Sequence, residues 1–139
     1  MRICLTLYEY TMAKTSLSAG VIIRDILTKD AEVSRIAKKV FPVVVDSAQL
    51  PYVAYRRSRL EHNPTKAKAP GADTVQIDVN CYAATYEESI ALAEAVRAAL
   101  DYAQGEIPGL KMRSCTLADA EEFYEDDAFV ESLAFKVQI

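Results

Sequence analysis

The sequence predicts an α+β fold, in which an antiparallel sheet of about four to five strands has helices packed on one face. Segments with helical spacing occur near the start and in the middle of the 139-residue chain, and segments with the two-residue alternation of strands lie around them. Short turns connect several of the strand segments, which favours antiparallel pairing. With so few helical segments, we expect the helices to cover one side of the sheet.

Length and composition are those of a single globular domain. Apolar residues make up 51% of the chain and charged residues 26%, which excludes wholesale disorder. We predict one domain over residues 12–139, preceded by an N-terminal extension over residues 1–11. Met12 is an alternative start that would make the extension dispensable. The alternation of apolar and polar residues in the extension equally suits an added edge strand.

The first predicted elements are two short helices and a strand. Ser18 is a candidate N-cap for a helix over residues 18–27, and Asp30 is a candidate N-cap for the helix that follows. Pro42 cannot continue a helix, and the β-branched residues around it predict extended backbone over residues 41–45.

A long hairpin is predicted next. Residues 50–56 open its first strand, and the turn signals within residues 61–71 predict an exposed loop. The return strand has the clearest alternation in the chain. Its apolar members are Val75, Ile77, Val79 and Cys81, and the residues between them are Gln76, Asp78, Asn80 and Tyr82.

The second half of the sequence predicts one long helix and two strands. Thr85 and Glu88 form a capping box at the start of the helix, and Gly105 is the predicted stop. Residues 110–117 and 129–139 are the last two predicted strands. An acidic segment joins them, and we expect it to be a solvated loop.

Charge is distributed unevenly along the chain, although the net charge is only −4. Residues 56–68 form a basic block with a charge of +4, and residues 117–131 form an acidic block with a charge of −7. The candidate interface residues are Arg56, Arg57, Arg59, Lys66 and Lys68 in the basic block and Glu121, Glu122, Glu125, Asp126 and Asp127 in the acidic block. Two patches of opposite charge in one small domain suit self-assembly.

Each block also has other interpretations. The basic block could contact phosphates or could simply be a solvated hairpin, but it lacks the aromatic platforms that bind single-stranded nucleic acid. The acidic block could bind a divalent cation, but it lacks the EF-hand pattern. The acidic net charge excludes a protein that coats nucleic acid, and we expect no sequence-specific nucleic-acid binding. No apolar run approaches the roughly 20 residues that span a bilayer, so no membrane partner is expected.

The sequence contains little that could support catalysis. His62 is the only histidine, so a nucleophilic triad would have to use it, and its turn-rich surroundings favour an incidental solvated side chain. Three cysteines without a C-x-x-C motif fit a reducing cytosol, and Cys81 is expected to be a buried thiol. The glycines form no phosphate-binding loop. We therefore expect no catalytic residue, no cofactor and no metal.

Two stretches of the sequence resemble the tail completion family of tailed bacteriophages, whose members are tail terminators or head–tail joining proteins. The first comprises residues 40–45 (VFPVVV) and residues 50–55 (LPYVAY). The second comprises residues 75–86 (VQIDVNCYAATY) and runs into an alanine-rich segment over residues 91–100. The order and spacing of these motifs match the family over roughly residues 18–105.

The resemblance implies an α+β protein that forms a ring, often hexameric, without catalysis. Such a ring caps the tail tube and faces the head connector, so the implied partners are further copies of the chain, the tail tube protein and the head–tail connector protein. The implied locations are the bacterial host cytoplasm during assembly and then the virion tail. The chain departs from the family pattern in two places: residues 1–11 precede the usual start, and residues 118–127 look longer and more acidic than the usual final hairpin.

Two other function classes remain open from the sequence. One is a small homo-oligomeric ligand-binding or regulatory α+β domain, with a pocket between the sheet and the helices. The other is an enzyme, which the single histidine and the absence of motifs make the weakest of the three. In the ring interpretation, we expect the basic block to contact the acidic block of a neighbouring copy or of another tail protein.

Overall fold

The computed structural model describes residues 14–43, 45, 49–62 and 73–139. It confirms the α+β class, with a sheet of five strands in the order β1-β2-β3-β7-β6. These strands are β1 (Val40–Pro42), β2 (Tyr52–Glu61), β3 (Thr74–Ala83), β6 (Ser114–Glu125) and β7 (Ala128–Gln138). β1 pairs with β2 in parallel, and the other neighbours are antiparallel. A separate hairpin consists of β4 (Gly105–Ile107) and β5 (Leu110–Met112).

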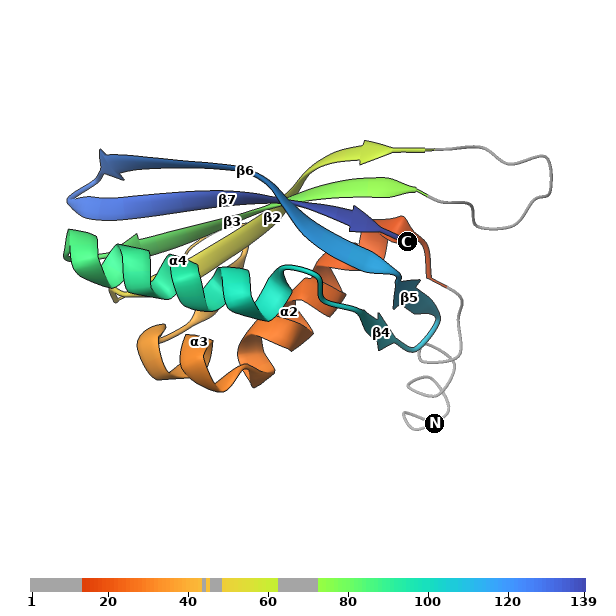
Figure 1. Ribbon diagram of the computed structural model, residues 1–139, viewed down its shortest axis with the longest axis horizontal. Helices are drawn as coiled ribbons and strands as arrows, with labels where there is room; N and C mark the ends of the chain where they lie inside the picture. The colour runs from red at the N-terminus through yellow and green to blue at the C-terminus, as the bar shows by residue number, and fades with distance from the viewer. Residues whose placement is uncertain (1–13, 44, 46–48, 63–72) are drawn as a thin grey trace, which may run out of the picture.

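The helices lie together on one face of the sheet (Figure 1). They are the 3-10 turn η1 (Ser16–Ser18) and the α-helices α2 (Ala19–Lys29), α3 (Ala31–Ile36) and α4 (Tyr86–Leu100). The core fills the space between these helices and the sheet, and its largest buried side chains are Phe135, Ile22, Ile23, Leu27, Ile77, Leu92, Leu100 and Met112. None of the helices in the described ranges is long and apolar enough to span a membrane.

We call the side of the sheet that faces away from these helices the open face, and the other side the helix side.

Two of the three predicted helix caps are present. The Asp30 side chain accepts hydrogen bonds from the backbone N–H groups of Glu32 and Val33, and the Thr85 hydroxyl accepts one from Glu88 at 3.2 Å. Ser18 occupies the N-cap position of α2 as predicted, but it does not act as a side-chain cap. Its side chain makes no capping hydrogen bond, and Thr15 instead caps the 3-10 turn that precedes α2.

The long helix ends earlier than predicted. α4 stops at Leu100, because the backbone of Asp101 turns to an extended conformation and its carboxylate accepts the Leu117 N–H at 3.0 Å. Gly105 is therefore not a helix stop but the first residue of β4. A Cβ atom at this position would lie 2.9 Å from Cγ2 of Ile22, so the glycine allows β4 to lie against α2.

The acidic block is not the predicted loop, since most of it forms the outer strand of a long hairpin. β6 continues to Glu125, and the turn that leads into β7 consists of Asp126 and Asp127, with φ angles of 50° and 60°. Two central residues with positive φ are typical of the type I′ turns that connect twisted antiparallel strands. The outer part of β6 is exposed on both faces, so carboxylates occupy both sides of the strand. The sequence there consequently lacks the apolar–polar alternation by which a strand is recognised.

The long β2–β3 hairpin and the buried alternation of β3 are confirmed. Val75, Ile77, Val79 and Cys81 are fully buried. The predicted strand over residues 41–45 is shorter than expected, because β1 ends at Pro42 and Val43 has a φ of 56°. The extension over residues 1–11 and most of the predicted hairpin loop lie outside the described residues.

Candidate docking surfaces

The three arginines of the basic block do not share one surface. A β-bulge between Arg57 and Arg59 shifts the register of β2, so that Arg57 pairs with Ile77 and Arg59 with Gln76. Neighbouring residues of a ladder point to opposite faces, and Arg57 and Arg59 are therefore on opposite sides of the sheet. Lys66 and Lys68 lie outside the described residues.

Each of these arginines has a partner within the chain. Arg57, on the helix side, donates from Nη1 to the Leu17 carbonyl at 3.0 Å. On the open face, Arg56 lies 3.8 Å from Asp78 and Arg59 lies 2.8 Å from Glu61. Both of the open-face arginine side chains remain more than half exposed, and exposed pairs of this kind contribute little to stability. They are consequently available to a partner, whereas Arg57 connects β2 to η1.

The acidic residues are divided between the two faces and the tip of the β6–β7 hairpin. Glu121 pairs with Ser132 on the open face, and Glu122 pairs with Glu131 on the helix side. Glu125, Asp126 and Asp127 are exposed at the turn. This turn is at one end of the sheet, and the connected ends of β2 and β3 are at the other (Figure 1). The end of β2 that carries Arg59 and the acidic turn therefore lie toward opposite ends of the sheet.

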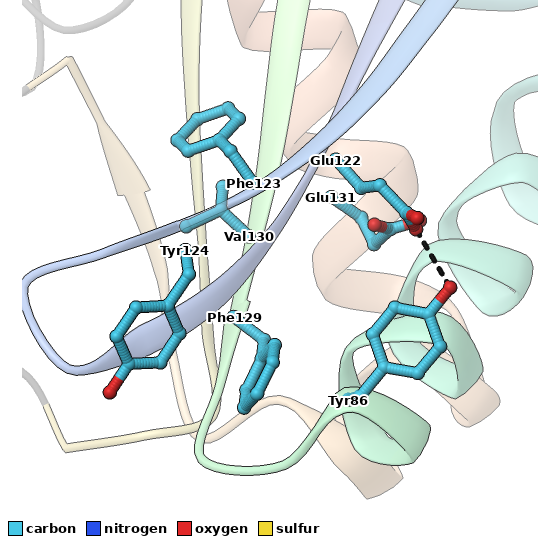
Figure 2. A pocket seen from close by; sticks show the side chains of 7 residues that line it. All are labelled: Tyr86, Glu122, Phe123, Tyr124, Phe129, Val130 and Glu131. Carbon is cyan, nitrogen blue, oxygen red and sulfur yellow. Dashed lines mark hydrogen bonds between the residues drawn. The ribbon is translucent and has the colours of Figure 1, made fainter.

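The helix side of the β6–β7 hairpin contains a pair of carboxyl groups beside a tyrosine (Figure 2). The Tyr86 hydroxyl, at the start of α4, donates to Oε2 of Glu122 at 2.9 Å. Burial and, after it, the adjacent Glu122 carboxylate raise the pKa of Glu131 to about 7. The same hydrogen bond to Glu122 raises the pKa of Tyr86. A like-charge pair held this closely favours a proton or another cation between its members.

The open face is mainly polar and has an aromatic cluster near β1. Rows of paired residues cross it, such as Arg56, Asp78, Ala134 and Asp119. Tyr52 stacks on Tyr82 with ring centroids 4.6 Å apart, and Phe41 meets Tyr52 edge-on at 5.7 Å. In the parts of the chain that the structure describes, no helix covers this face. It is a second surface that could contact another protein.

Among the residues that the structure describes, the histidine and the cysteines considered for catalysis lie apart and have no activating arrangement. His62 directly follows β2, and its Nδ1 lies 2.8 Å from Oδ1 of Asp73, which directly precedes β3. Asp73 also accepts a hydrogen bond from the Ser16 hydroxyl at 2.6 Å. Burial raises the pKa of the Cys115 thiol to about 12 and raises that of Cys81 as well, so both thiols remain protonated. Across the described ranges there is no group of three or more histidine, cysteine or acidic side chains that could hold a metal.

Fold and side chains together define a small α+β domain whose distinctive features are its charged and aromatic surfaces. The family described as Tail completion protein gp17 matches residues 22–139. The chain therefore belongs to this family of phage tail structural proteins, which are not enzymes, and it is a component of the virion tail.

Comparison with solved structures supports the same fold. A chain from the "Virion of native gene transfer agent (GTA) particle" superposes with a TM-score of 0.68 at 16% sequence identity, and the match covers 85% of this chain and 91% of that chain. No curated protein sequence matches. At this level of identity the match shows a shared fold.

Proposed function

We propose that the chain assembles into a ring, with a hexamer as the expected form, that terminates the tail tube and joins the tail to the head connector. The membership of the tail completion family carries this proposal. The similarity of the fold to a chain from a gene transfer agent virion is consistent with it. The proposed partners are other copies of the chain, the tail tube protein and the head–tail connector protein. Assembly would take place in the host cytoplasm.

Ring closure requires a heterologous contact, in which two different patches of each subunit meet. The sheet offers two different edges for such a contact. In the described ranges, no strand pairs with the outer edge of β6, and none pairs with the outer edge of β2 beyond Tyr55, where its pairing with β1 ends. The first edge carries Asp119, Glu121 and Glu125, and the second carries Arg56 and Arg59. Opposite charges at the two edges would favour head-to-tail association and fix its direction.

The experiment is a paired substitution of the open-face arginines. Arg56→Ser with Arg59→Ser removes the charge of the basic edge and spares Arg57, whose bond to Leu17 supports the fold. We expect the purified wild-type chain to form a ring in light scattering and negative-stain images, and we expect the double variant to form fewer rings and to join fewer tails.

A matched control removes two other exposed cations. Lys29→Ser with Arg35→Ser affects side chains that are equally exposed and that also pair within the chain, with Asp25 and Glu32. We expect this control to assemble as the wild type does. Equal assembly by both double variants would exclude the basic edge as an interface, and a wild-type chain that neither forms rings nor joins tails would contradict the ring itself.

A further inference from the structure

A pocket lies between the β6–β7 hairpin and the start of α4 (Figure 2). Its volume is about 230 Å³, and three aromatic rings form much of its wall: Tyr86 from α4, Tyr124 from β6 and Phe129 from β7. Phe129 is the central ring, since it meets Tyr124 edge-on at 4.9 Å and Tyr86 edge-on at 6.0 Å. Tyr86 is 44% exposed and Tyr124 is 59% exposed, so the pocket is open to solvent.

Two carboxyl groups lie at the other side of this pocket. Glu122 already accepts one hydrogen bond, from the Tyr86 hydroxyl. Oε2 of Glu131 is buried and has no hydrogen-bond partner among the described residues. A buried acceptor without a donor costs free energy, and the cost is larger when the group is ionised. Among the described residues, Glu131 Oε2 therefore lacks a hydrogen-bond donor, and a positively charged donor would also offset the repulsion between the two carboxylates.

The combination of rings and carboxylates suits an organic cation better than a metal ion. Aromatic faces attract cations and exclude water from them, and carboxylates accept charge-assisted hydrogen bonds. A hard divalent ion takes six or more oxygen ligands, and the described residues offer no third acidic group here. Arginine fits more closely than lysine, since its planar guanidinium stacks on rings and presents five donors that could reach both carboxylates.

We propose that this pocket receives an arginine side chain from a partner protein, with the guanidinium between the Glu122 and Glu131 carboxylates and against the Tyr86, Tyr124 and Phe129 rings. The charge of the surroundings supports this occupant, because the pocket opens beside the exposed carboxylates of Glu125, Asp126 and Asp127. The inference deepens the proposed docking role of the acidic block and rests on it for the source of the arginine. The pocket would be the anchor point within that block.

The test uses a small probe on the full-length chain. Nα-acetyl-arginine methylamide is titrated at pH 8 and followed by the backbone amide resonances of residues 86, 122–124 and 129–131. We expect saturable shifts confined to these residues. The citrulline analogue has the same shape without the charge, and we expect it to bind at least tenfold more weakly. The lysine analogue is expected to bind more weakly than arginine.

Matched variants separate the pocket from the general acidity of the hairpin. Glu131→Gln and Glu122→Gln are each expected to weaken probe binding at least fivefold. Glu121→Gln removes the same charge from the neighbouring position on the opposite face, and it is expected to change binding less than twofold. Circular dichroism melting of every variant checks that the fold is retained.

Binding should also weaken as the pH falls from 8 to 6, because the guanidinium must replace a proton on the carboxyl pair. Tyr86 on α4 and Cys81 on β3 face this pair, and because the pKa of each is raised, both stay neutral in this range. Glu87 on α4 lies near Tyr86. Glu87→Gln should leave the pH dependence in place, and Glu131→Gln should remove most of it.

The inference is overturned if the arginine probe gives no saturable shift, if citrulline or lysine binds as well, or if Glu121→Gln weakens binding as much as Glu131→Gln. Probe binding needs neither a ring nor a tail, so its failure would leave the proposed ring intact. Conversely, a wild-type chain that binds the probe but forms no ring would contradict the proposed function and leave the pocket in place.

Discussion

Glu122 and Glu131 face each other directly across the β6–β7 ladder, on the side of the sheet that α4 occupies. Carboxylates directly opposite each other on antiparallel strands repel, and burial of Glu131 adds to the cost of its charge. The pair therefore lowers the stability of the folded chain when no partner is bound. Such a cost is reasonable at a surface that another protein covers.

Glu131→Gln should increase the stability of the isolated chain at alkaline pH. The pKa of Glu131 in the folded protein, about 7, is above its ordinary value of 4.5, so the folded state binds the proton more tightly than the unfolded state. The contribution of Glu131 to wild-type stability is therefore largest below pH 4.5, and it is lost as the pH rises through 7. Because the carboxyl is partly exposed, solvent screening reduces the effect, and we expect the variant to gain about 1 kcal/mol at pH 8 and almost nothing at pH 4.5.

Guanidinium chloride unfolding at the two pH values measures this difference. Glu121→Gln is the control, since Glu121 lies on the open face opposite Ser132 and should show no comparable gain. A Glu131→Gln variant that is less stable than the wild type at pH 8 would show that the ionised carboxylate is stabilising, contrary to this prediction.

Asp127→Gly, at the turn between β6 and β7, should stabilise the hairpin. Asp126 and Asp127 have φ angles of 50° and 60°, a region that a glycine occupies without strain. The glycine at the second position also gives the Asp-Gly pair preferred in type I′ turns. Relief of the left-handed conformation is worth roughly 1 kcal/mol, offset in part by the greater entropy of glycine in the unfolded chain.

Thermal unfolding of the Asp127→Gly variant checks this expectation, and Asp119→Gly is the contrasting case. Asp119 lies within β6 and its backbone conformation requires no glycine, so the substitution there should destabilise the chain. If the two variants shifted the melting temperature in the same direction, the turn conformation would not be the source of the effect.

Thr85→Ala should destabilise the chain by about 1 kcal/mol, since the Thr85 hydroxyl accepts the Glu88 N–H at the start of α4. Thr85→Ser keeps the acceptor and should retain most of the stability. Chemical unfolding of the two variants separates the cap from the packing of the side chain: equal losses in both would mean that the methyl group, and not the hydroxyl, is responsible.

The sequence was most informative where a single face of an element is buried. β3 is a central strand with one side on the core, so its alternation was evident, and α4 begins with a cap that is local in sequence. The outer part of β6 was not recognised as a strand, because it extends where few of its side chains are buried. The end of α4 was misplaced because Asp101 bonds to Leu117, a contact that depends on the tertiary fold.

The candidate surfaces were predictable by residue type but not by arrangement. A single bulge in β2 places Arg57 and Arg59 on opposite faces, and local sequence does not indicate where a bulge occurs. The Glu122–Glu131 pair had a usable signal. Once Asp126 and Asp127 are taken as a two-residue turn, counting outward along the strands brings these glutamates opposite each other. The hydrogen bond from Tyr86 to Glu122 could not be predicted in this way, because it depends on how α4 packs against the sheet.

Two glycine substitutions should have opposite effects, because the space around the two residues differs. At Gly105, a Cβ would be 2.9 Å from Cγ2 of Ile22, so Gly105→Ala forces β4 away from α2 and should cost about 1–3 kcal/mol. At Gly20, within α2, a Cβ would be 3.5 Å from the Tyr55 ring, an ordinary contact, and Gly20→Ala should add up to about 1 kcal/mol through helix propensity.

Each glycine variant serves as the control for the other, since both lose the same flexibility in the unfolded chain. Unfolding by guanidinium chloride gives the two free energies. Because the contact with the Cγ2 methyl of Ile22 is the cause assigned to the first effect, Ile22→Leu, whose side chain lacks this branch at Cβ, should recover part of the stability when combined with Gly105→Ala. Purely additive effects of the two substitutions would exclude the close contact between β4 and α2 as the reason for the glycine.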